Sequence, residues 1–190
     1  ETALRLLQQS LKELQTDYAD LVFVHSLGAD KMDPRLVFSR YGCYPALMRA
    51  KGQGLTRFVG FSGHNRPQRF VEAIQTSEVD VLLNAVNFVD RHTYNFEQAV
   101  WPAARQRNIG LVAMKVYGGA LTTPFAGLSH CLMPKAYLDS AFRYAVGIPQ
   151  VACAIIGMAT RDELQANLKR AVQATALTTR ELCDLERIGK

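Results

Sequence analysis

Five apolar, β-branched runs in this 190-residue sequence each end on a residue that could take part in chemistry. An imidazole, a hydroxyl, an amide, an amine and a glycine stand at these ends, contributed by His25, Ser62, Asn84, Lys115 and Gly157. An imidazole can donate a hydrogen bond to an oxygen that develops negative charge, and a hydroxyl can both donate and accept. The carboxyl ends of parallel strands share one rim. We therefore expect these residues to surround a single mouth, in the layout of an active site.

The runs that lead to these residues have the composition of strands buried on both faces. They are Leu21–Val24, Phe58–Phe61, Val79–Leu83, Leu111–Met114 and Val151–Ile156. A helix-like stretch follows each run, and strands that alternate with helices predict parallel βα units.

Apolar spacing and capping residues predict the helices. We expect them at Glu1–Gln15, Leu36–Ala50, Arg66–Thr76, Asn95–Gln106 and Pro134–Val146, and after the capping boxes that begin at Thr160 and Thr178. Pro102 is expected to bend or shorten the fourth of these helices. The segment Tyr117–Pro134 is rich in Gly, Thr and Pro, and we predict a long loop that could act as a lid over the rim.

The spacing of the five end residues indicates the fold. They lie between 22 and 42 positions apart, which suits a (β/α)8 TIM barrel of roughly 31 residues per unit. Eight strands close such a barrel, whereas five leave unpaired edges. The sequence opens within a helical pattern, which favours an incomplete barrel over an open, doubly wound sheet. We predict an α/β fold with residues 1–190 as a single domain: five βα units and a C-terminal helix, from a barrel whose N-terminal units are absent.

Composition narrows the function classes. Hydrophobic residues make up 48% and charged residues 21% of the chain, which is ordinary for a soluble protein. The net charge of +5 is spread along the sequence without a basic tract, so we expect no nucleic-acid partner. No apolar run approaches the roughly 20 residues that span a bilayer. The four cysteines form no CxxC pair, so we expect reduced thiols, no metal site and a cytoplasmic location.

Four segments carry patterns that together resemble one family. They are Ser10–His25 (S-L-x-x-L-x-x-D-Y-A-D-L-x-x-V-H), Leu47–Ser62 (L-M-R-A-K-G … R-F-V-G-F-S), Gly110–Leu121 (G-L-V-A … G-G-A-L) and Ile155–Leu168 (I-I-G-M … E-L-Q-A-N-L). In this order and spacing they resemble the aldo-keto reductases, which use NAD(P)H on a (β/α)8 barrel. The resemblance implies strands four to eight of that barrel and an oxidoreductase that transfers hydride from NAD(P)H to an aldehyde or ketone.

The resemblance assigns one catalytic residue to this chain. His25 matches the histidine that orients the substrate carbonyl; the alternative is an imidazole bonded to neighbouring loop backbone. The family's catalytic Tyr, Lys and Asp belong to its first strands, and no residue here occupies those positions. The chain as given should therefore not reduce carbonyls efficiently. Two other functions stay open: a non-catalytic, truncated or cofactor-sensing barrel protein, and a Schiff-base aldolase that uses Lys115.

Further residues match the family's cofactor site. Ser62 matches the serine that holds the nicotinamide carboxamide, and Gly63 stands where the family usually has Asn. Asn84 lies near the position of a family amide side chain that also binds the nicotinamide carboxamide. Asn87 is the alternative residue for this role. Met114 takes the place of a stacking aromatic ring, unless it is a core residue, and Lys115 would be a cation at the rim.

The last strand and its helix are expected to hold the adenosine phosphate. The matching residues are Gly157, Met158, Thr160, Arg161, Glu163 and, at the adenine, Asn167. Free N–H groups at a helix start attract anions. NADP-preferring relatives place Lys or Arg at the positions of Gly157 and Glu163, and the Glu163 carboxylate would repel a 2′-phosphate. The choice between NADPH and NADH therefore stays open, as does the identity of the small carbonyl substrate.

Overall fold

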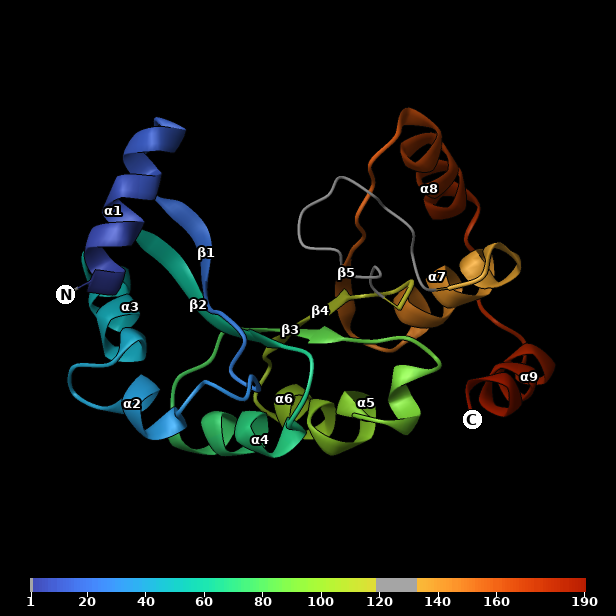
Figure 1. The fold of residues 1–190 in the computed structure, drawn as a ribbon, viewed down its shortest axis with the longest axis horizontal. Helices are drawn as coiled ribbons and strands as arrows, with labels where there is room; N and C mark the ends of the chain where they lie inside the picture. The colour runs from blue at the N-terminus through green and yellow to red at the C-terminus, as the bar shows by residue number, and fades with distance from the viewer. Residues whose placement is uncertain (1, 119–132) are drawn as a thin grey trace. The chain divides into compact units, whose positions relative to one another are not determined.

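The computed structural model describes residues 2–118 and 133–190, and its chain contacts divide into two compact units. Unit 1 contains residues 1–83 and 99–110, and unit 2 contains residues 84–98 and 111–190. Figure 1 labels the elements of both units. Most of the expected loop or lid at Tyr117–Pro134 lies outside the described residues.

All five expected strands are present. They are β1 (Ala19–Val24), β2 (Thr56–Gly63), β3 (Val81–Ala85), β4 (Gly110–Met114) and β5 (Val151–Ile155). They follow one another in the sheet in chain order, and the pairs β1/β2 and β4/β5 are parallel. The parallel α/β fold is thus confirmed. The third strand starts and ends two residues later than predicted, so Asn84 lies inside β3 rather than after it.

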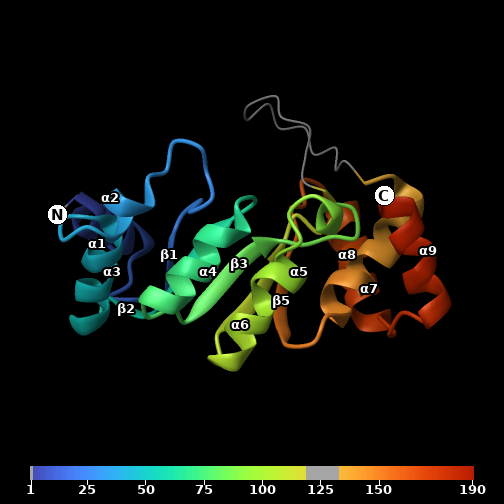
Figure 2. The same cartoon turned by 90° about the horizontal axis from the view of Figure 1, so that it is seen from below.

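Unit 1 packs short helices against β1 and β2. Its helices are α1 (Thr2–Leu14), α2 (Pro34–Phe38), α3 (Cys43–Gly52), α4 (Pro67–Thr76) and α6 (Trp101–Gln106). Helix α1 lies beside α3, and α4 packs against α6 (Figure 2). Phe61 of β2 and Phe70 of α4 are completely buried, and each contributes about 1.5–3 kcal/mol relative to an exposed ring. These rings anchor α4 against β2, the strand that carries Ser62 and Gly63.

The single helix expected at Leu36–Ala50 is wrong, because two helices fill this range. The Asp33 carboxylate caps the first by accepting from the Arg35 N–H at 2.9 Å. A turn follows, closed by the Gly42 N–H and the Ser39 carbonyl at 2.8 Å. A Cβ at Gly42 would lie 2.1 Å from the Val37 carbonyl oxygen. The chain turns too tightly here for a helix to continue, and helical periodicity alone does not reveal such a turn.

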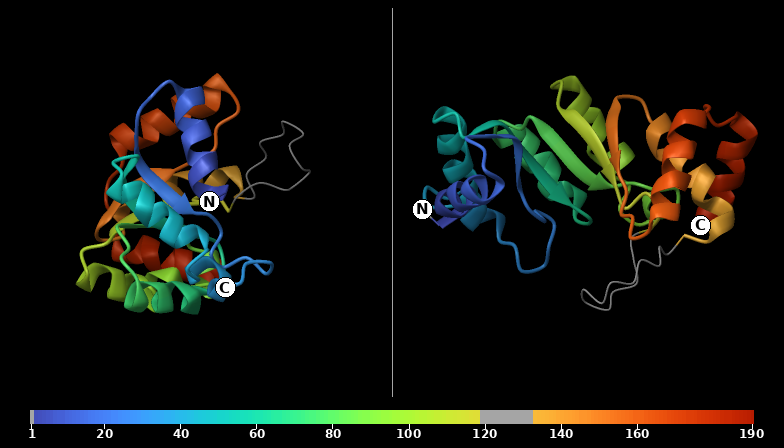
Figure 3. Two further views of the ribbon diagram at one scale, coloured as in Figure 1. Left: turned by 90° about the vertical axis from the view of Figure 1, so that its left-hand side faces the viewer. Right: turned by 90° about the horizontal axis from the view of Figure 1, so that it is seen from above.

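Unit 2 carries the C-terminal helices on one side of β5 (Figure 3). Its helical segments are η1 (Asp90–His92), α5 (Phe96–Ala99), η2 (Lys135–Tyr137), α7 (Leu138–Gly147), α8 (Arg161–Gln173) and α9 (Thr179–Gly189). The expected helix Asn95–Gln106 is divided into α5 and α6, with Pro102 in the first turn of α6. Both predicted capping boxes are confirmed, at the starts of α8 and α9. Within the described ranges no helix is long and apolar enough to cross a membrane.

Candidate active site

His25 and Ser62 lie together at the carboxyl ends of β1 and β2. The His25 Nδ1 is 3.2 Å from the Ser62 Oγ, and the same oxygen accepts from the Ser26 N–H at 3.2 Å. The Ser62 carbonyl accepts from the Leu27 N–H at 2.8 Å. Ser62 is 2% exposed, whereas His25 is exposed. The alternative of a His25 ring bonded to loop backbone is not what the structure shows, because its neighbour is the Ser62 side chain.

Helix α4 fastens the loop that follows His25. One nitrogen of the Arg69 guanidinium, Nη1, donates to the carbonyls of Leu27, Ala29 and Met32 at 3.1, 2.9 and 2.8 Å. The neighbouring Arg66 donates to the Gly28 carbonyl at 3.3 Å. Hydrogen bonds from a charged donor are stronger than neutral ones. Sequence reasoning placed Arg69 on a helix surface and missed this function of the two arginines, which no local pattern signals.

Gly63 stands beside Ser62 because its surroundings have no room for a side chain. A Cβ at this position would lie 2.5 Å from the Cζ of Phe70, a completely buried ring of α4. Only glycine fits without displacing that ring. The departure from the family's usual Asn therefore has a packing cause within this chain.

In unit 2 the two candidate asparagines have different environments. Asn87 builds a turn: its Nδ2 donates to Asp90 at 2.7 Å and to the Lys115 carbonyl at 3.0 Å, and its Oδ1 accepts from the backbone N–H groups of Val89 and Asp90. All of its hydrogen-bonding groups are thus used within the protein. Asn84 is completely buried in β3. Both side chains are completely buried, so their environments favour neither asparagine as a ligand contact.

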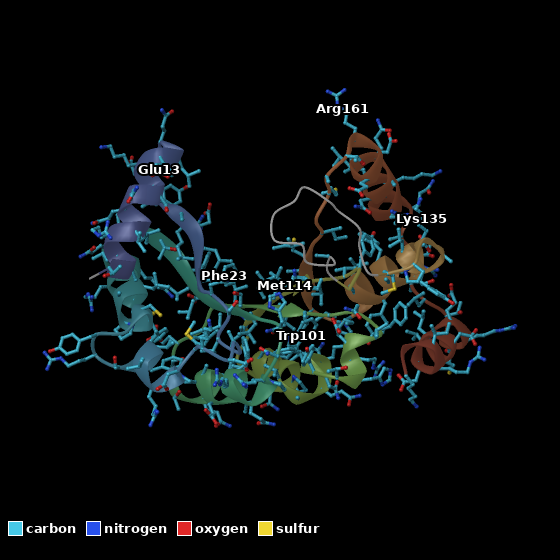
Figure 4. The ribbon with its side chains drawn as sticks, viewed as in Figure 1. Glu13, Phe23, Trp101, Met114, Lys135 and Arg161 are labelled. Atoms are coloured by element: carbon cyan, nitrogen blue, oxygen red, sulfur yellow. The ribbon has the colours of Figure 1, made fainter. Side chains whose placement is uncertain are left out.

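Met114 is the last residue of β4, and Lys115 follows it next to that turn. Figure 4 labels Met114, which is half-buried, and Lys115 is exposed with a left-handed φ of 56°. A Schiff-base lysine requires a desolvated pocket or an adjacent cation. The exposure of Lys115 therefore gives the aldolase alternative no support.

The carboxylate of Glu163 lies at the N-terminus of α8. The Glu163 Oε2 accepts from the N–H groups of Ala159 and Thr160 at 2.6 and 3.2 Å, and the Glu163 N–H donates to the Thr160 Oγ1 at 3.2 Å. The sequence predicted that Glu163 is engaged in this capping box, and that prediction is confirmed. The carboxylate therefore takes the N–H groups of Ala159 and Thr160, which are not free for the phosphate expected at the start of this helix. The Arg161 side chain points away from the helix and is exposed (Figure 4).

Asn167 of α8 is oriented by two donors. Its Oδ1 accepts from the Tyr117 hydroxyl at 2.8 Å and from the Arg170 guanidinium at 3.0 Å. The amide nitrogen therefore presents its two N–H groups to other acceptors. Sequence reasoning named Asn167 but not Tyr117 or Arg170, although Arg170 follows it by three residues on the same helix, a spacing that brings side chains together.

Tyr144 of α7 has the chemistry of a proton donor but the environment of a structural residue. Its hydroxyl donates to Glu97 at 2.6 Å. Burial, followed by the charge of Glu97, raises the pKa of Tyr144 far above its ordinary value of 10. This tyrosine keeps its proton and links α7 to α5. It offers no substitute for a catalytic tyrosine.

The parallel βα units, with an imidazole and a hydroxyl paired at the ends of two strands, have the architecture of part of an α/β barrel, a class of fold whose enzymes carry their active sites at the carboxyl ends of the strands. Residues 1–130 match the model of the Aldo/keto reductase family. The chain belongs to this family.

Known relatives agree with this assignment. The chain is 20% identical over 93% of its length to L-galactose dehydrogenase of Arabidopsis thaliana and 31% identical over 60% of its length to methylglyoxal reductase DkgB of Salmonella typhi. It spans 60% and 41% of the lengths of these two relatives. Among solved structures, the holo form of aldo-keto reductase AKR11C1 from Bacillus halodurans has a TM-score of 0.72 at 21% identity, over 99% of this chain and 67% of that one. The five βα units thus correspond to about two thirds of a known barrel.

Proposed function

We propose that the protein is an NAD(P)H-dependent oxidoreductase that reduces an aldehyde or a ketone. The observation that supports this proposal is the pair formed by His25 and Ser62. An exposed imidazole at a strand end is backed by a buried hydroxyl at 3.2 Å, in a chain of the aldo-keto reductase family. The cofactor supplies the hydride when bound.

His25 is proposed to hold the carbonyl oxygen of the substrate. As negative charge develops on that oxygen, a hydrogen bond from the imidazole becomes stronger, and this difference stabilises the transition state. Arg69 keeps the turn after β1 in place through its three carbonyl contacts, so the ring is held before the substrate arrives.

The residues present fit the nicotinamide end of the cofactor better than a 2′-phosphate. Ser62 retains a lone pair that could accept from a carboxamide N–H group, and Asn167 offers its amide N–H groups to adenine. At the start of α8, by contrast, the Glu163 carboxylate occupies the N–H groups of Ala159 and Thr160. A second anion beside it would be repelled. We propose that NADH binds at least as well as NADPH.

The remaining catalytic groups are proposed to come from N-terminal βα units of the same barrel. An apolar hollow of about 430 Å³ lies between α7, β5 and α8. Leu164 and Leu168 of α8 line this hollow, and together with Val172 they are 43%, 57% and 86% exposed at helical spacing. Such a stripe normally faces a partner element. Further βα units would cover it and would bring the Tyr, Lys and Asp that the family uses.

The test is carbonyl reduction by the longest polypeptide that carries this chain, followed by the loss of cofactor absorbance. We expect reduction of small aldehydes, and a loss of at least roughly a hundredfold in kcat/KM with His25→Ala. His92→Ala is the matched control, because His92 lies on η1 beside Glu186 and not at the candidate site. Binding of the cofactor without turnover would favour the cofactor-sensing alternative. No binding and no turnover would overturn the proposal.

The proposed partner is a small carbonyl compound rather than nucleic acid or a membrane, and the proposed location is the cytoplasm. The free thiols of Cys43, Cys153 and Cys183 are consistent with a reducing compartment. Fractionation of cells that produce the native protein would test this location.

A further inference from the structure

The Ser62 hydroxyl makes two contacts within the protein, in addition to the cofactor contact proposed for it. Its oxygen lies 3.2 Å from the backbone nitrogen of Ser26 and 3.2 Å from the His25 Nδ1. The backbone N–H can only donate, so this contact uses one lone pair of the hydroxyl. The contact with His25 can run in either direction, depending on which ring nitrogen carries the proton.

The number of protons available on Ser62, Ser26 and His25 decides which way the hydrogen bond between Ser62 and His25 runs. Suppose the His25 Nδ1 carried the proton and donated to Ser62. Two N–H groups would then converge on the Ser62 oxygen, and the hydroxyl proton would need another acceptor. Among the contacts of the described residues, the His25 Nδ1 is the acceptor within reach of this hydroxyl. Ser62 is 2% exposed, and a buried donor without an acceptor costs about 1–3 kcal/mol.

We infer that Ser62 is a positioning residue that donates its proton to the His25 Nδ1 and so fixes the imidazole in its Nε2–H tautomer. The ring then turns an N–H donor toward the exposed side. This inference rests on the proposed function, because a donor is what a carbonyl oxygen requires and the opposite tautomer would present a repelling lone pair. The Ser26 backbone helps, because its N–H holds the hydroxyl oxygen while the hydroxyl proton faces the ring.

The backbone around the pair is arranged for this contact. Ser26 has a left-handed φ of 55°, which is uncommon for a residue other than glycine. This conformation accompanies an N–H directed at the Ser62 side chain, and the next N–H, from Leu27, reaches the Ser62 carbonyl at 2.8 Å. One residue of β2 thus binds two consecutive N–H groups of the turn that carries His25.

Nuclear magnetic resonance of histidine nitrogens tests the inference without any need for turnover. We would label histidine with ¹⁵N in the longest polypeptide that carries this chain and assign His25 among the four histidines by His25→Gln. At a pH where the ring is neutral, we expect a pyridine-like Nδ1 and a pyrrole-like Nε2 for His25. In Ser62→Ala we expect both resonances to move toward their mean, because the preference for one tautomer is reduced. Ser62→Thr keeps the hydroxyl and should restore the original pattern.

Ser39→Ala is the matched control, because among the described residues the Ser39 hydroxyl donates to the nearby Leu36 carbonyl and not to the candidate site. It should leave the His25 resonances unchanged. A pyrrole-like Nδ1 in the unchanged protein would overturn the inference, as would identical His25 resonances in Ser62→Ala and Ser39→Ala. In the assay, Ser62→Ala should lower kcat and Ser62→Thr should restore it. The expected tautomer in a protein that reduces no carbonyl would contradict the proposed function and leave the hydrogen bond intact.

Discussion

The Glu163 carboxylate lies 2.6 Å from the backbone nitrogen of Ala159, at the start of α8. The capping box that stabilises this helix therefore also fills the place where an anion would approach its N-terminus. We therefore expect the same side chain to affect both helix stability and the choice of cofactor.

Replacement of Glu163 should change the cofactor preference. Glu163→Gln keeps an acceptor for the capping box but removes the charge, so NADPH should bind about two- to fivefold more tightly relative to NADH, the ratio that 0.3–1 kcal/mol at a helix start gives. Glu163→Arg should shift the ratio further. Titration of both nucleotides by their fluorescence measures it. Glu181→Gln, in the equivalent capping box of α9, should not change the ratio. Equal ratios in all variants would show that Glu163 does not affect the choice of nucleotide.

Acid should weaken the attachment of α9. Hydrogen bonds from the Arg143 guanidinium, at 2.7 and 3.3 Å, and from Thr178 lower the pKa of Glu181 from 4.5 to about 2. A carboxylate with a lowered pKa stabilises the folded state above its unfolded pKa. This contribution should therefore be complete above pH 4.5 and be lost as the pH falls toward about 2.

Thermal unfolding between these pH values, with and without Glu181→Gln, measures this contribution. The substitution should lower the melting temperature at neutral pH and have a smaller effect near pH 2. An equal effect at both ends would show that the charge of Glu181 is irrelevant. Arg187→Gln breaks only an exposed pair with Asp184 and is the control.

Addition of a side chain at position 63 should destabilise unit 1. In Gly63→Ala the new Cβ meets the buried Phe70 ring at 2.5 Å, and overpacking of this kind costs about 1–3 kcal/mol. Denaturant unfolding measures this cost. Gly52→Ala, in α3 with no atom within 4 Å of its Cβ, should be neutral or stabilising. In a Phe70→Leu background the cost of Gly63→Ala should fall, and an unchanged cost would exclude the clash as its cause.

Removal of the Arg69 guanidinium should loosen the loop after His25. Arg69→Gln loses the charged donor to three carbonyls, and one hydrogen bond to a charged group is worth roughly 1.5–3 kcal/mol. Hydrogen exchange should accelerate in residues 26–32 and stay unchanged in β4. Arg57→Gln removes an exposed pair with Asp20 and should change neither. Unaltered exchange in residues 26–32 would contradict the anchoring by Arg69.

Thiol labelling should reveal whether further βα units cover β5. Cys153 of β5 and Cys183 of α9 are both exposed in this chain. In a longer polypeptide with the N-terminal units, Cys153 should react at least roughly tenfold more slowly with a maleimide, while Cys183 should react at the same rate. Peptide mapping separates the two sites. Equal rates for Cys153 in both polypeptides would show that these units do not cover this part of β5.

Local sequence patterns predicted most of the elements. Each strand is a continuous apolar run, and both capping boxes consist of residues three positions apart, so neighbouring residues suffice to find them. The division of Leu36–Ala50 into α2 and α3 escaped prediction because it depends on the close approach of Gly42 to the Val37 carbonyl. Periodicity carries no information on such an approach.

In the candidate site, too, local patterns predicted some features and missed the contacts between distant residues. His25, Ser62 and Glu163 were named from their positions at strand and helix ends, together with the family's motifs. The sequence by itself determined the order of the βα units, the family and which residue types stand at the strand ends, because these depend on neighbours along the chain. Only the tertiary structure decided that Ser62 contacts the His25 ring, that Phe70 excludes a side chain at Gly63 and that Glu163 also takes the Ala159 N–H group. Such contacts depend on distances of a few tenths of an ångström between atoms, and residue order does not specify those distances.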